Sequence, residues 1–256
     1  MASIAEKEPL LLAGVFPPLP AVERGVPANI SASADGTMLI YTQGHNVVVR
    51  SVEDLGSSFV YQEHKENTTC AQFSPSGHYI ASADSGGKLR VWSWTNPEHI
   101  LKNECSLMPK GINDLCWDSE SKRIAVAGDG KMKAMCVSFD TGSDLGNGMV
   151  GHTKPALSIA YRPSRPFRIA SAGEDMAVMF YEGPPFKWKH SNKKVHGSFI
   201  NCVRYAPNGA LFSTCASDKK LAFYDGATGE LKFEIPEAHA GSLYSCAWSR
   251  DSAQFL

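Results

Sequence analysis

Two histidine–aspartate pairs stand at nearly the same spacing in this sequence. His152 precedes Asp175 by 23 residues, and His196 precedes Asp218 by 22 residues. A histidine beside a carboxylate can exchange protons in catalysis, or it can be a buried ring whose nitrogens need hydrogen-bond partners. We interpret both pairs as structural. Each His and Asp is expected to hydrogen-bond to one another and to a strand Ser or Thr, which locks the turns of one structural unit.

No other group of residues has the spacing of a catalytic or metal centre. The chain has no Gly-x-Ser-x-Gly motif, no phosphate-binding glycine loop and no metal-ligand spacing. Its seven cysteines form no Cys-x-x-Cys pair, and four of them lie in or beside a strand expected to open a repeat: Cys70, Cys116, Cys202 and Cys246. We interpret them as small buried side chains in a reducing compartment. The sequence therefore predicts no enzyme, no cofactor and no bound metal.

The elements that carry these residues repeat along the chain. A polar turn after an apolar run recurs six times, and the second residues of successive turns are 41 to 44 residues apart. The turns are Asp35-Gly36, Ser76-Gly77, Glu120-Ser121, Ser164-Arg165, Asn208-Gly209 and Asp251-Ser252. A period of about 40–45 residues with four short strands per unit is typical of WD-repeat propeller blades. No stretch has sustained helical periodicity.

These repeats predict an all-β fold, an incomplete WD-repeat β-propeller. Blades are expected near residues 27–51, 64–92, 111–140, 152–181 and 196–225, with a partial blade at 239–256 and an extended amino-terminal segment at 1–26. About five and a half blades are thus expected, whereas most WD-repeat rings have about seven. The sequence is therefore expected to be an amino-terminal fragment of a longer protein.

Two of the expected blades lack a complete histidine–aspartate pair. Unit two has Gly86 where the Asp would stand, and unit three lacks both members. We expect packing alone to hold these two blades.

Composition and charge exclude several classes of function. The 256 residues are 43% apolar, which is enough for a substantial core, and 25 basic side chains nearly balance 26 acidic ones. A net charge of −1 gives no electrostatic footprint for nucleic acid or for a membrane surface. The longest apolar stretch near the start, 10–16, is too short to span a bilayer and ends at Pro17-Pro18. We expect a cytosolic protein with no small-molecule substrate.

Four segments that ordinary blades lack carry a resemblance to a known family. They are 17–25, 138–146, 162–168, which reads Arg-Pro-Ser-Arg-Pro-Phe-Arg, and 180–189, which contains Gly-Pro-Pro-Phe. This set, in this order, resembles the actin-interacting protein 1 family, whose members are cytosolic WD-repeat proteins of two seven-bladed propellers. The resemblance covers essentially all 256 residues. It aligns them with the first five blades and part of the sixth blade of the amino-terminal propeller.

The resemblance implies a non-enzymatic partner of actin filaments. Members of that family act with ADF/cofilin, which decorates and severs filaments, and they accelerate disassembly and block regrowth at severed barbed ends. Four residues match motifs where the family's first propeller meets its partners: Asp129, Glu174, Trp188 and Phe199. Trp188 stands where Phe is more usual, and Asp129 stands where Glu is more usual. The first change keeps an aromatic side chain and the second keeps an acidic one.

The residues themselves leave other interpretations open. Asp129 and Glu174 fall in turns between strands, where a charge can pair with a partner's basic group or simply face solvent. Phe186 is a fifth candidate contact, because it and Trp188 follow two prolines and are expected in a loop, where an aromatic anchors an interface well. Phe186 can instead fold back onto its own blade. A generic WD-repeat scaffold for another protein complex is the alternative function.

Overall fold

The structure is a computed structural model that describes residues 16–54, 56–146 and 149–256. In this part of the chain, nineteen β-strands form five antiparallel sheets. Four sheets have four strands and the third has three, and within each sheet the strands that follow one another in the chain are hydrogen-bonded neighbours. None of the described residues belongs to a helix that is long and apolar enough to cross a membrane.

The sheets, called blades one to five, are built from strands of three to six residues joined by short connections. Blade one contains β1 (Ile30–Ala32), β2 (Met38–Gln43), β3 (Asn46–Ser51) and β4 (Ser58–Tyr61). Blade two contains β5 (Thr68–Phe73), β6 (Tyr79–Asp84), β7 (Lys88–Ser93) and β8 (Leu101–Ser106). Blade three contains β9 (Ile112–Trp117), β10 (Arg123–Gly128) and β11 (Ala134–Ser138). Blade four contains β12 (Ala156–Tyr161), β13 (Arg168–Gly173), β14 (Val178–Glu182) and β15 (Lys187–Asn192). Blade five contains β16 (Ile200–Tyr205), β17 (Leu211–Ala216), β18 (Leu221–Asp225) and β19 (Leu231–Ile235).

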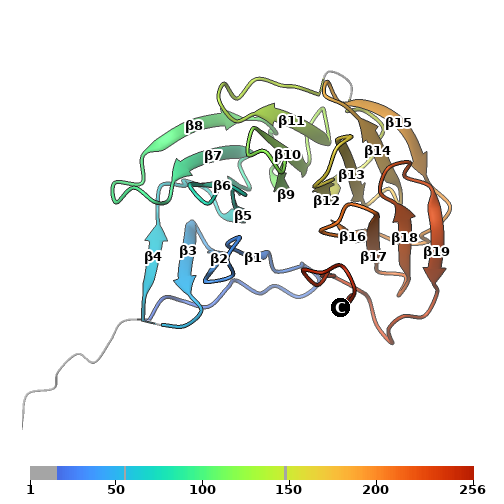
Figure 1. The fold of residues 1–256 in the computed structure, drawn as a ribbon, viewed down its shortest axis with the longest axis horizontal. Helices are drawn as coiled ribbons and strands as arrows, with labels where there is room; N and C mark the ends of the chain where they lie inside the picture. Colours follow the sequence, from blue (N-terminus) through green and yellow to red (C-terminus); the bar gives the residue numbers. More distant parts are fainter. Residues whose placement is uncertain (1–15, 55, 147–148) are drawn as a thin grey trace, which may run out of the picture.

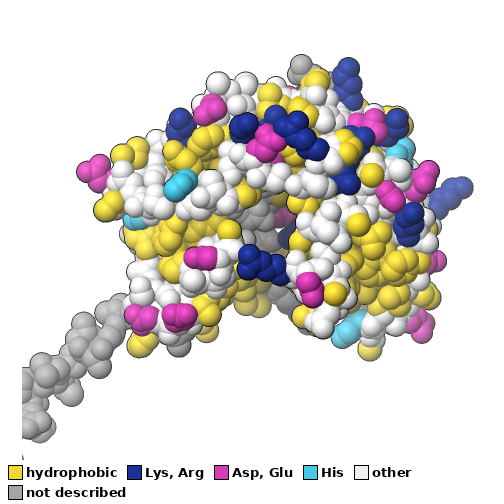
Figure 2. Space-filling view, in the orientation of Figure 1, with side chains coloured by type: hydrophobic (Ala, Val, Ile, Leu, Met, Phe, Trp, Pro, Cys, Tyr) yellow, Lys and Arg dark blue, Asp and Glu magenta, His cyan; other side chains and the backbone are white. Residues whose placement is uncertain are grey.

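The five blades stand side by side around a common centre (Figure 1). The first strands β1, β5, β9, β12 and β16 lie innermost, and each contacts the first strand of the next blade. The fourth strands β4, β8, β15 and β19 lie at the periphery. The molecule is hollowed at the centre of this arc, and basic and acidic side chains are interspersed on the face that Figure 2 shows. The all-β propeller predicted from the repeats is therefore confirmed.

Apolar side chains fill the spaces between neighbouring blades. One buried cluster joins blades two and three through Leu89, Leu115 and Val126. Another joins blades three and four through Cys136 and Tyr161. The second strands β6, β10, β13 and β17 are buried at every residue but the first. Because each blade buries its faces against its neighbours, contacts between blades carry much of the stability, as in other repeat proteins.

The ranges expected for the blades stop short of their fourth strands. β8, β15 and β19 lie beyond the expected ends of blades two, four and five, and β4 lies beyond that of blade one. These outer strands are largely exposed, and no residue of β8, β15 or β19 is buried. Such strands lack the apolar runs by which the inner strands are recognised, so periodicity alone did not reveal them.

Two segments flank the five blades. Residues 16–29 contain no strand, and the Ala21 amide donates a hydrogen bond to the Thr42 carbonyl of blade one at 3.1 Å. The first fifteen residues of the expected segment 1–26 lie outside the described residues. Residues 239–256, expected to begin a sixth blade, contain an antiparallel bridge between Trp248 and Phe255. Both of these rings pack edge-on against Phe223 of blade five.

Candidate partner-binding rim

One backbone hydrogen bond recurs in blades two to five and defines a common rim. The residue after the second strand donates its amide to the carbonyl of the residue before the first strand, at 2.8 to 3.0 Å. The four donor–acceptor pairs are Ser85 to Asn67, Asp129 to Gly111, Glu174 to Pro155, and Ser217 to Phe199. We call these eight residues the rim. Asp129 and Glu174 therefore occupy the same position in successive blades, and Phe199 lies on the same edge one blade further on.

The two histidine–aspartate pairs lie directly beneath this rim. His152 Nδ1 is 3.0 Å from Oδ1 of Asp175, and its Nε2 is 2.7 Å from the Ser171 hydroxyl. In blade five the ring of His196 lies 3.3 Å from the carboxylate of Asp218 and 2.7 Å from the hydroxyl of a strand threonine. Because the aspartates follow the second strands, these bonds tie the turn that ends one strand to the segment that begins another.

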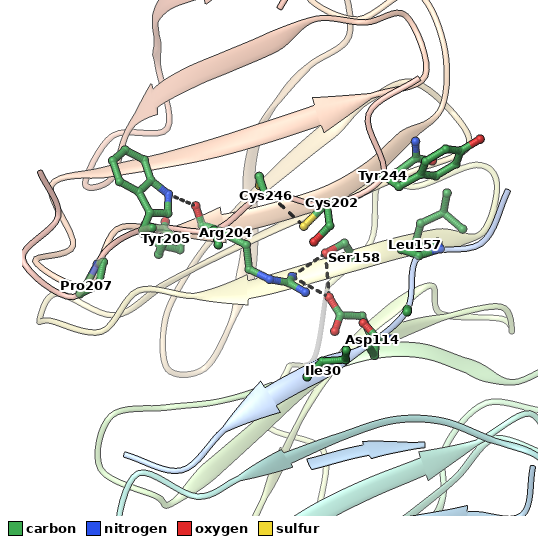
Figure 3. Close-up of a pocket in the computed structure, with 17 residues that line it drawn as sticks. Ile30, Asp114, Leu157, Ser158, Cys202, Arg204, Tyr205, Pro207, Tyr244 and Cys246 are labelled. Atoms are coloured by element: carbon green, nitrogen blue, oxygen red, sulfur yellow. Dashed lines mark hydrogen bonds and ion pairs between the residues drawn. The ribbon is translucent and has the colours of Figure 1, made fainter. Parts of the chain in front are cut away.

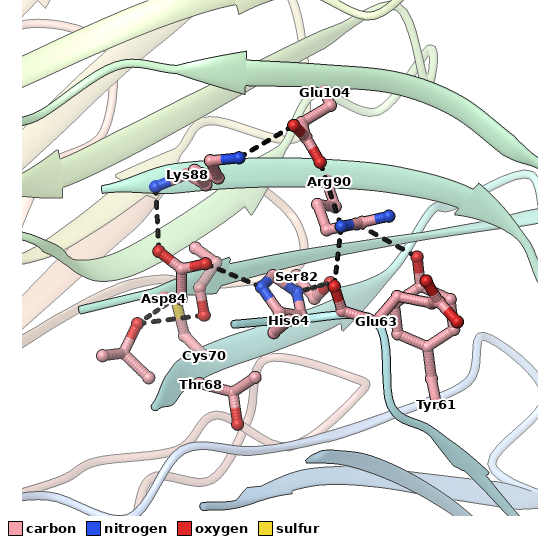
Figure 4. Close-up of polar contacts among 12 residues, drawn as sticks. Tyr61, Glu63, His64, Thr68, Cys70, Ser82, Asp84, Lys88, Arg90 and Glu104 are labelled. Atoms are coloured by element: carbon pink, nitrogen blue, oxygen red, sulfur yellow. Dashed lines mark hydrogen bonds and ion pairs between the residues drawn. The ribbon is translucent and has the colours of Figure 1, made fainter. Parts of the chain in front are cut away.

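Blade two corrects the expectation drawn from Gly86, because it has a complete hydrogen-bonded group of its own (Figure 4). Nδ1 of His64 donates to Oδ2 of Asp84 at 2.9 Å, and Nε2 accepts from the Ser82 hydroxyl at 2.8 Å. The Ser82 oxygen in turn accepts the indole N–H of Trp92 at 3.2 Å. A carboxylate only accepts, which fixes the direction of each bond in this chain. The carboxylate comes from the last residue of β6, and a Cβ at Gly86 would lie 3.3 Å from its Oδ1.

Blade three places apolar groups where blade two has polar ones. Met108 lies four residues before β9, as His64 lies four residues before β5, and Val126 takes the position of Ser82. Both side chains are buried in the cluster between blades two and three. Packing therefore replaces hydrogen bonding in this blade, as expected, whereas the same expectation was wrong for blade two.

Asp129 is held by two lysines of its own blade. Its carboxylate pairs with Lys133 and lies 3.5 Å from the ammonium of Lys110. The hydrogen bond from Lys133 holds the pKa of Asp129 below its ordinary value. Only 22% of the side chain is exposed. The charge on this turn is thus largely matched within the blade, which leaves less of it for a partner.

Glu174 and Phe199 face a common pocket at the rim. Both residues line a hollow of about 950 Å³, together with Asn29 and Asn113 of the inner segments. Glu174 takes part in none of the ion pairs formed among the residues that the structure describes. The Phe199 ring is 43% exposed and has the ammonium of Lys154 at 5.9 Å from its centre. A carboxylate and an exposed aromatic face that line one pocket suit a basic side chain from a partner.

Phe186 does not lie on the surface. It is fully buried, with its ring edge-on to Tyr161 at 5.5 Å, and its amide donates to the Leu145 carbonyl at 3.0 Å. A Cβ at Gly183 would come within 2.7 Å of the ring, so the glycine permits this close approach. Phe186 therefore folds back between blades three and four. Its predicted role as a direct partner contact is wrong, because no face of the ring is accessible.

Trp188 is exposed, but it lies in a strand rather than in the expected loop. It is the second residue of β15, paired with Tyr181, and 48% of it is exposed. Its ring would touch a Cβ placed at Gly151, at 3.2 Å. Asn192, which pairs with the first residue of β14, marks the rim end of this strand. Asn192 lies four positions along the strand from Trp188, which corresponds to about 13 Å. Trp188 thus lies on the outer wall, apart from the Glu174–Phe199 pocket.

Comparison with known proteins identifies the repeats. The family model described as WD domain, G-beta repeat, matches residues 56–93 and 189–225. These two segments carry WD repeats. The first match ends with β7 of blade two, and the second begins within β15 of blade four and ends with β18 of blade five.

Curated relatives match nearly the whole length of the chain. "WD repeat-containing protein 1" of Gallus gallus is 42% identical over 245 residues, which are 94% of this chain and 40% of the relative. "Actin-interacting protein 1" of Drosophila melanogaster is 39% identical over 244 residues, which are again 94% of this chain and 40% of the relative. "Actin-interacting protein 1-2" of Arabidopsis thaliana is 43% identical over 230 residues, which are 88% of this chain and 37% of the relative. The chain is homologous to these proteins and spans about 40% of the length of the curated relatives it matches.

The centre of the five blades holds a polar network that the sequence reasoning missed (Figure 3). Oδ2 of Asp114 accepts hydrogen bonds from the Ser158 hydroxyl at 2.7 Å and from Nη1 of Arg204 at 2.9 Å. The three residues come from the innermost strands of blades three, four and five. Asp114 and Ser158 are 44 residues apart and occupy the same place in their repeats. That periodic spacing, applied to polar residues as well as to turns, would have revealed the network.

Two buried histidines make stability depend on pH near neutrality. Burial lowers the pKa of His64 and of His196 below the ordinary value. The unfolded chain therefore binds protons at these sites as pH falls below about 6.5, while the folded chain resists them. Full stability is expected above that pH, and each histidine should remove about 1.4 kcal/mol per pH unit below it. Urea unfolding between about pH 7.5 and pH 5.5 measures this loss. His196→Gln should flatten the pH dependence, and an unchanged slope would contradict the assignment.

Proposed function

We propose that this chain belongs to an actin-filament-binding protein that cooperates with ADF/cofilin to promote filament disassembly and to cap barbed ends through non-catalytic contacts. Homology to proteins named actin-interacting protein 1 supports actin as the partner. Cooperation with cofilin and capping rest on the resemblance of the 162–168 and 180–189 segments to that family. A cytosolic location on the actin cytoskeleton follows from the same proposal. Because the chain spans about 40% of those relatives, it contributes one part of this activity.

The observation that carries the proposal is the pairing of Glu174 and Phe199 at the rim. The Glu174 carboxylate, which has no ion pair among the described residues, and the exposed Phe199 ring line one pocket, and each belongs to the rim hydrogen bond of its own blade. Aromatic residues on rigid elements bury much area at little entropic cost, which is the property of interface hot spots. Trp188 offers a second exposed aromatic on the outer wall of blade four. Asp129 contributes less, since Lys110 and Lys133 already match its charge.

The engagement of the buried histidines supports a non-catalytic role. In blades two, four and five, both ring nitrogens of the histidine beneath the rim form hydrogen bonds, one with an aspartate and one with a hydroxyl. A general base needs a free nitrogen within reach of a substrate proton. These rings lie inside the blades and have none to offer.

Co-sedimentation of the chain with actin filaments tests the proposal, with and without cofilin and beside a full-length relative as positive control. We expect pelleting that increases when cofilin decorates the filaments. If the relative pellets and this chain does not, these blades carry no independent filament site. If neither pellets, the alternative of a WD-repeat scaffold for another complex gains ground.

The rim pocket should carry most of the binding energy of this surface. Glu174→Ala combined with Phe199→Ala is expected to weaken cofilin-dependent filament binding by about 30-fold, the effect of one hot spot. Binding isotherms from the same pelleting experiment measure the change. Ser85→Ala, at the equivalent rim position of blade two, is the matched control and should leave affinity within about twofold. Equal losses in the control and in the double variant would reject the pocket as the contact.

Trp188→Ala tests whether the outer wall of blade four contributes to partner binding in addition to the rim pocket. If the partner surface extends from the rim to β15, this variant loses affinity as well, and the two losses add because the sites do not touch.

A further inference from the structure

The fold gathers three cysteines that lie far apart in the sequence. Cys202 lies in β16, Cys215 lies opposite it in β17, and Cys246 lies in the segment that follows blade five. The three sulfurs all lie within 4.8 Å of one another, and those of Cys202 and Cys246 are 3.7 Å apart. All three side chains are buried, and together they form the centre of an apolar cluster.

The repeat explains how two of these thiols come to face each other. Cys202 and Cys246 are 44 residues apart and hold the same position in successive units. Asp114 and Ser158 hold that position in blades three and four, where they make the central polar network. The third thiol, Cys215, comes from the neighbouring strand of the same blade. In blade two the equivalent residue, Cys70, belongs to no such cluster among the described residues.

The distances suit a thiolate metal centre. Zinc binds cysteine sulfur at about 2.3 Å with tetrahedral angles, which places two bound sulfurs about 3.8 Å apart. The separation of Cys202 and Cys246 already matches this value. The sulfur of Cys215 lies within 4.8 Å of both others.

The surroundings leave room for a fourth ligand and supply a compensating charge. Cys202 and Cys246 line a central pocket of about 310 Å³ that also contains Arg204 (Figure 3). The hydroxyl of Ser213 lies 3.7 Å from the Cys246 sulfur.

We propose that Cys202, Cys215 and Cys246 form a zinc-binding site with its fourth position open to the central pocket. Each thiol releases its proton to solvent, and each sulfur donates an electron pair to the Zn²⁺ ion. Three thiolates and the ion carry a net charge of −1, and the guanidinium of Arg204, which also pairs with Asp114, lines the same central pocket. Bound zinc joins the segment after blade five to β16 and β17, and thereby fixes this segment against blade five. This site is independent of the proposed actin contact, because none of its ligands belongs to the rim.

Metal titration of the reduced, chelator-treated 256-residue chain tests the proposal. With a chromophoric chelator as competitor, we expect one tight equivalent of Zn²⁺ per chain and a higher unfolding midpoint once it is bound. Co²⁺ in place of Zn²⁺ should show the sulfur charge-transfer absorption of tetrahedral thiolate coordination. Cys215→Ser should remove the tight equivalent, and Cys70→Ser, at the same repeat position as Cys202, should retain it.

Several results would overturn the site. They are no tight equivalent in the unmodified chain, zinc binding without the cobalt–sulfur absorption, or equal zinc binding by the Cys215→Ser and Cys70→Ser variants. Because loss of zinc by an unfolded variant would be uninformative, circular dichroism of each metal-free variant is compared with that of the unmodified chain. Cys246→Ala, which keeps the apolar character of the cluster, provides a second variant that must also lose the tight equivalent.

Discussion

Replacing His64 with alanine is expected to lower the free energy of unfolding by about 3 to 5 kcal/mol, because it leaves a buried carboxylate without its partner. Both His64 and Asp84 are almost completely buried, and their side chains meet at 2.9 Å. The backbone amide of Lys88 would still donate to Asp84, at 3.0 Å, but one hydrogen bond does not replace the lost water shell. Urea unfolding followed by tryptophan fluorescence measures the change.

His78→Ala supplies the control for this prediction. His78 lies in the turn between β5 and β6 of the same blade, and its side chain is exposed. Its removal should change the free energy of unfolding by no more than about 0.5 kcal/mol. If the two variants were equally stable, blade two would depend on packing alone, as blade three does with Met108 and Val126.

Blade two shows where repeat reasoning from sequence succeeds and where it stops. The period of the polar turns correctly predicted propeller blades, because turn residues and apolar strands are imposed by local sterics and by burial. The same alignment placed Gly86 at the aspartate position and concluded that the group was broken. It could not show that Asp84, two residues earlier at the end of β6, turns its carboxylate to His64. Side-chain reach across a turn is a property of the fold, and a position-by-position comparison does not contain it.

The sequence likewise predicted part of the candidate site and not the rest. Asp129 and Glu174 were correctly placed in turns between strands, since such turns carry polar residues. Their different pairing, with two lysines around Asp129 and no ion pair at Glu174 among the described residues, depends on neighbours from other strands. The cysteines make the same point. Their spacing gives no metal motif, yet pairing of β16 with β17 and a 44-residue repeat bring three of them together.

The Gly-Pro-Pro-Phe segment was misread for a related reason. Two prolines end a regular hydrogen-bonded ladder, and a loop was therefore expected for Phe186 and Trp188. The prolines instead form the turn between β14 and β15, and the strand that follows begins directly after Phe186. Of the two aromatics, one is buried between blades and the other faces solvent. Sequence position alone treats them alike.

Phe186→Ala is accordingly expected to destabilise the fold by about 3 to 5 kcal/mol, through the lost burial of a phenyl ring and the cavity that it leaves. The ring is fully buried and packs edge-on against Tyr161 in the cluster between blades three and four. Urea unfolding measures this loss directly. Filament binding by the fraction that remains folded should keep its affinity, because Phe186 touches no partner.

Phe199→Ala gives the opposite result and completes the test. With 43% of this residue exposed, its replacement should cost less than about 1 kcal/mol of stability while it weakens filament binding. The two phenylalanines lie 13 residues apart in the sequence. The Phe186 variant therefore tests the core between blades three and four, and the Phe199 variant tests the proposed partner contact. If Phe199→Ala instead unfolded the chain and Phe186→Ala spared it, the assignment of core and surface in blades four and five would be reversed. Equal stability losses would mean that Phe199 supports the rim from within.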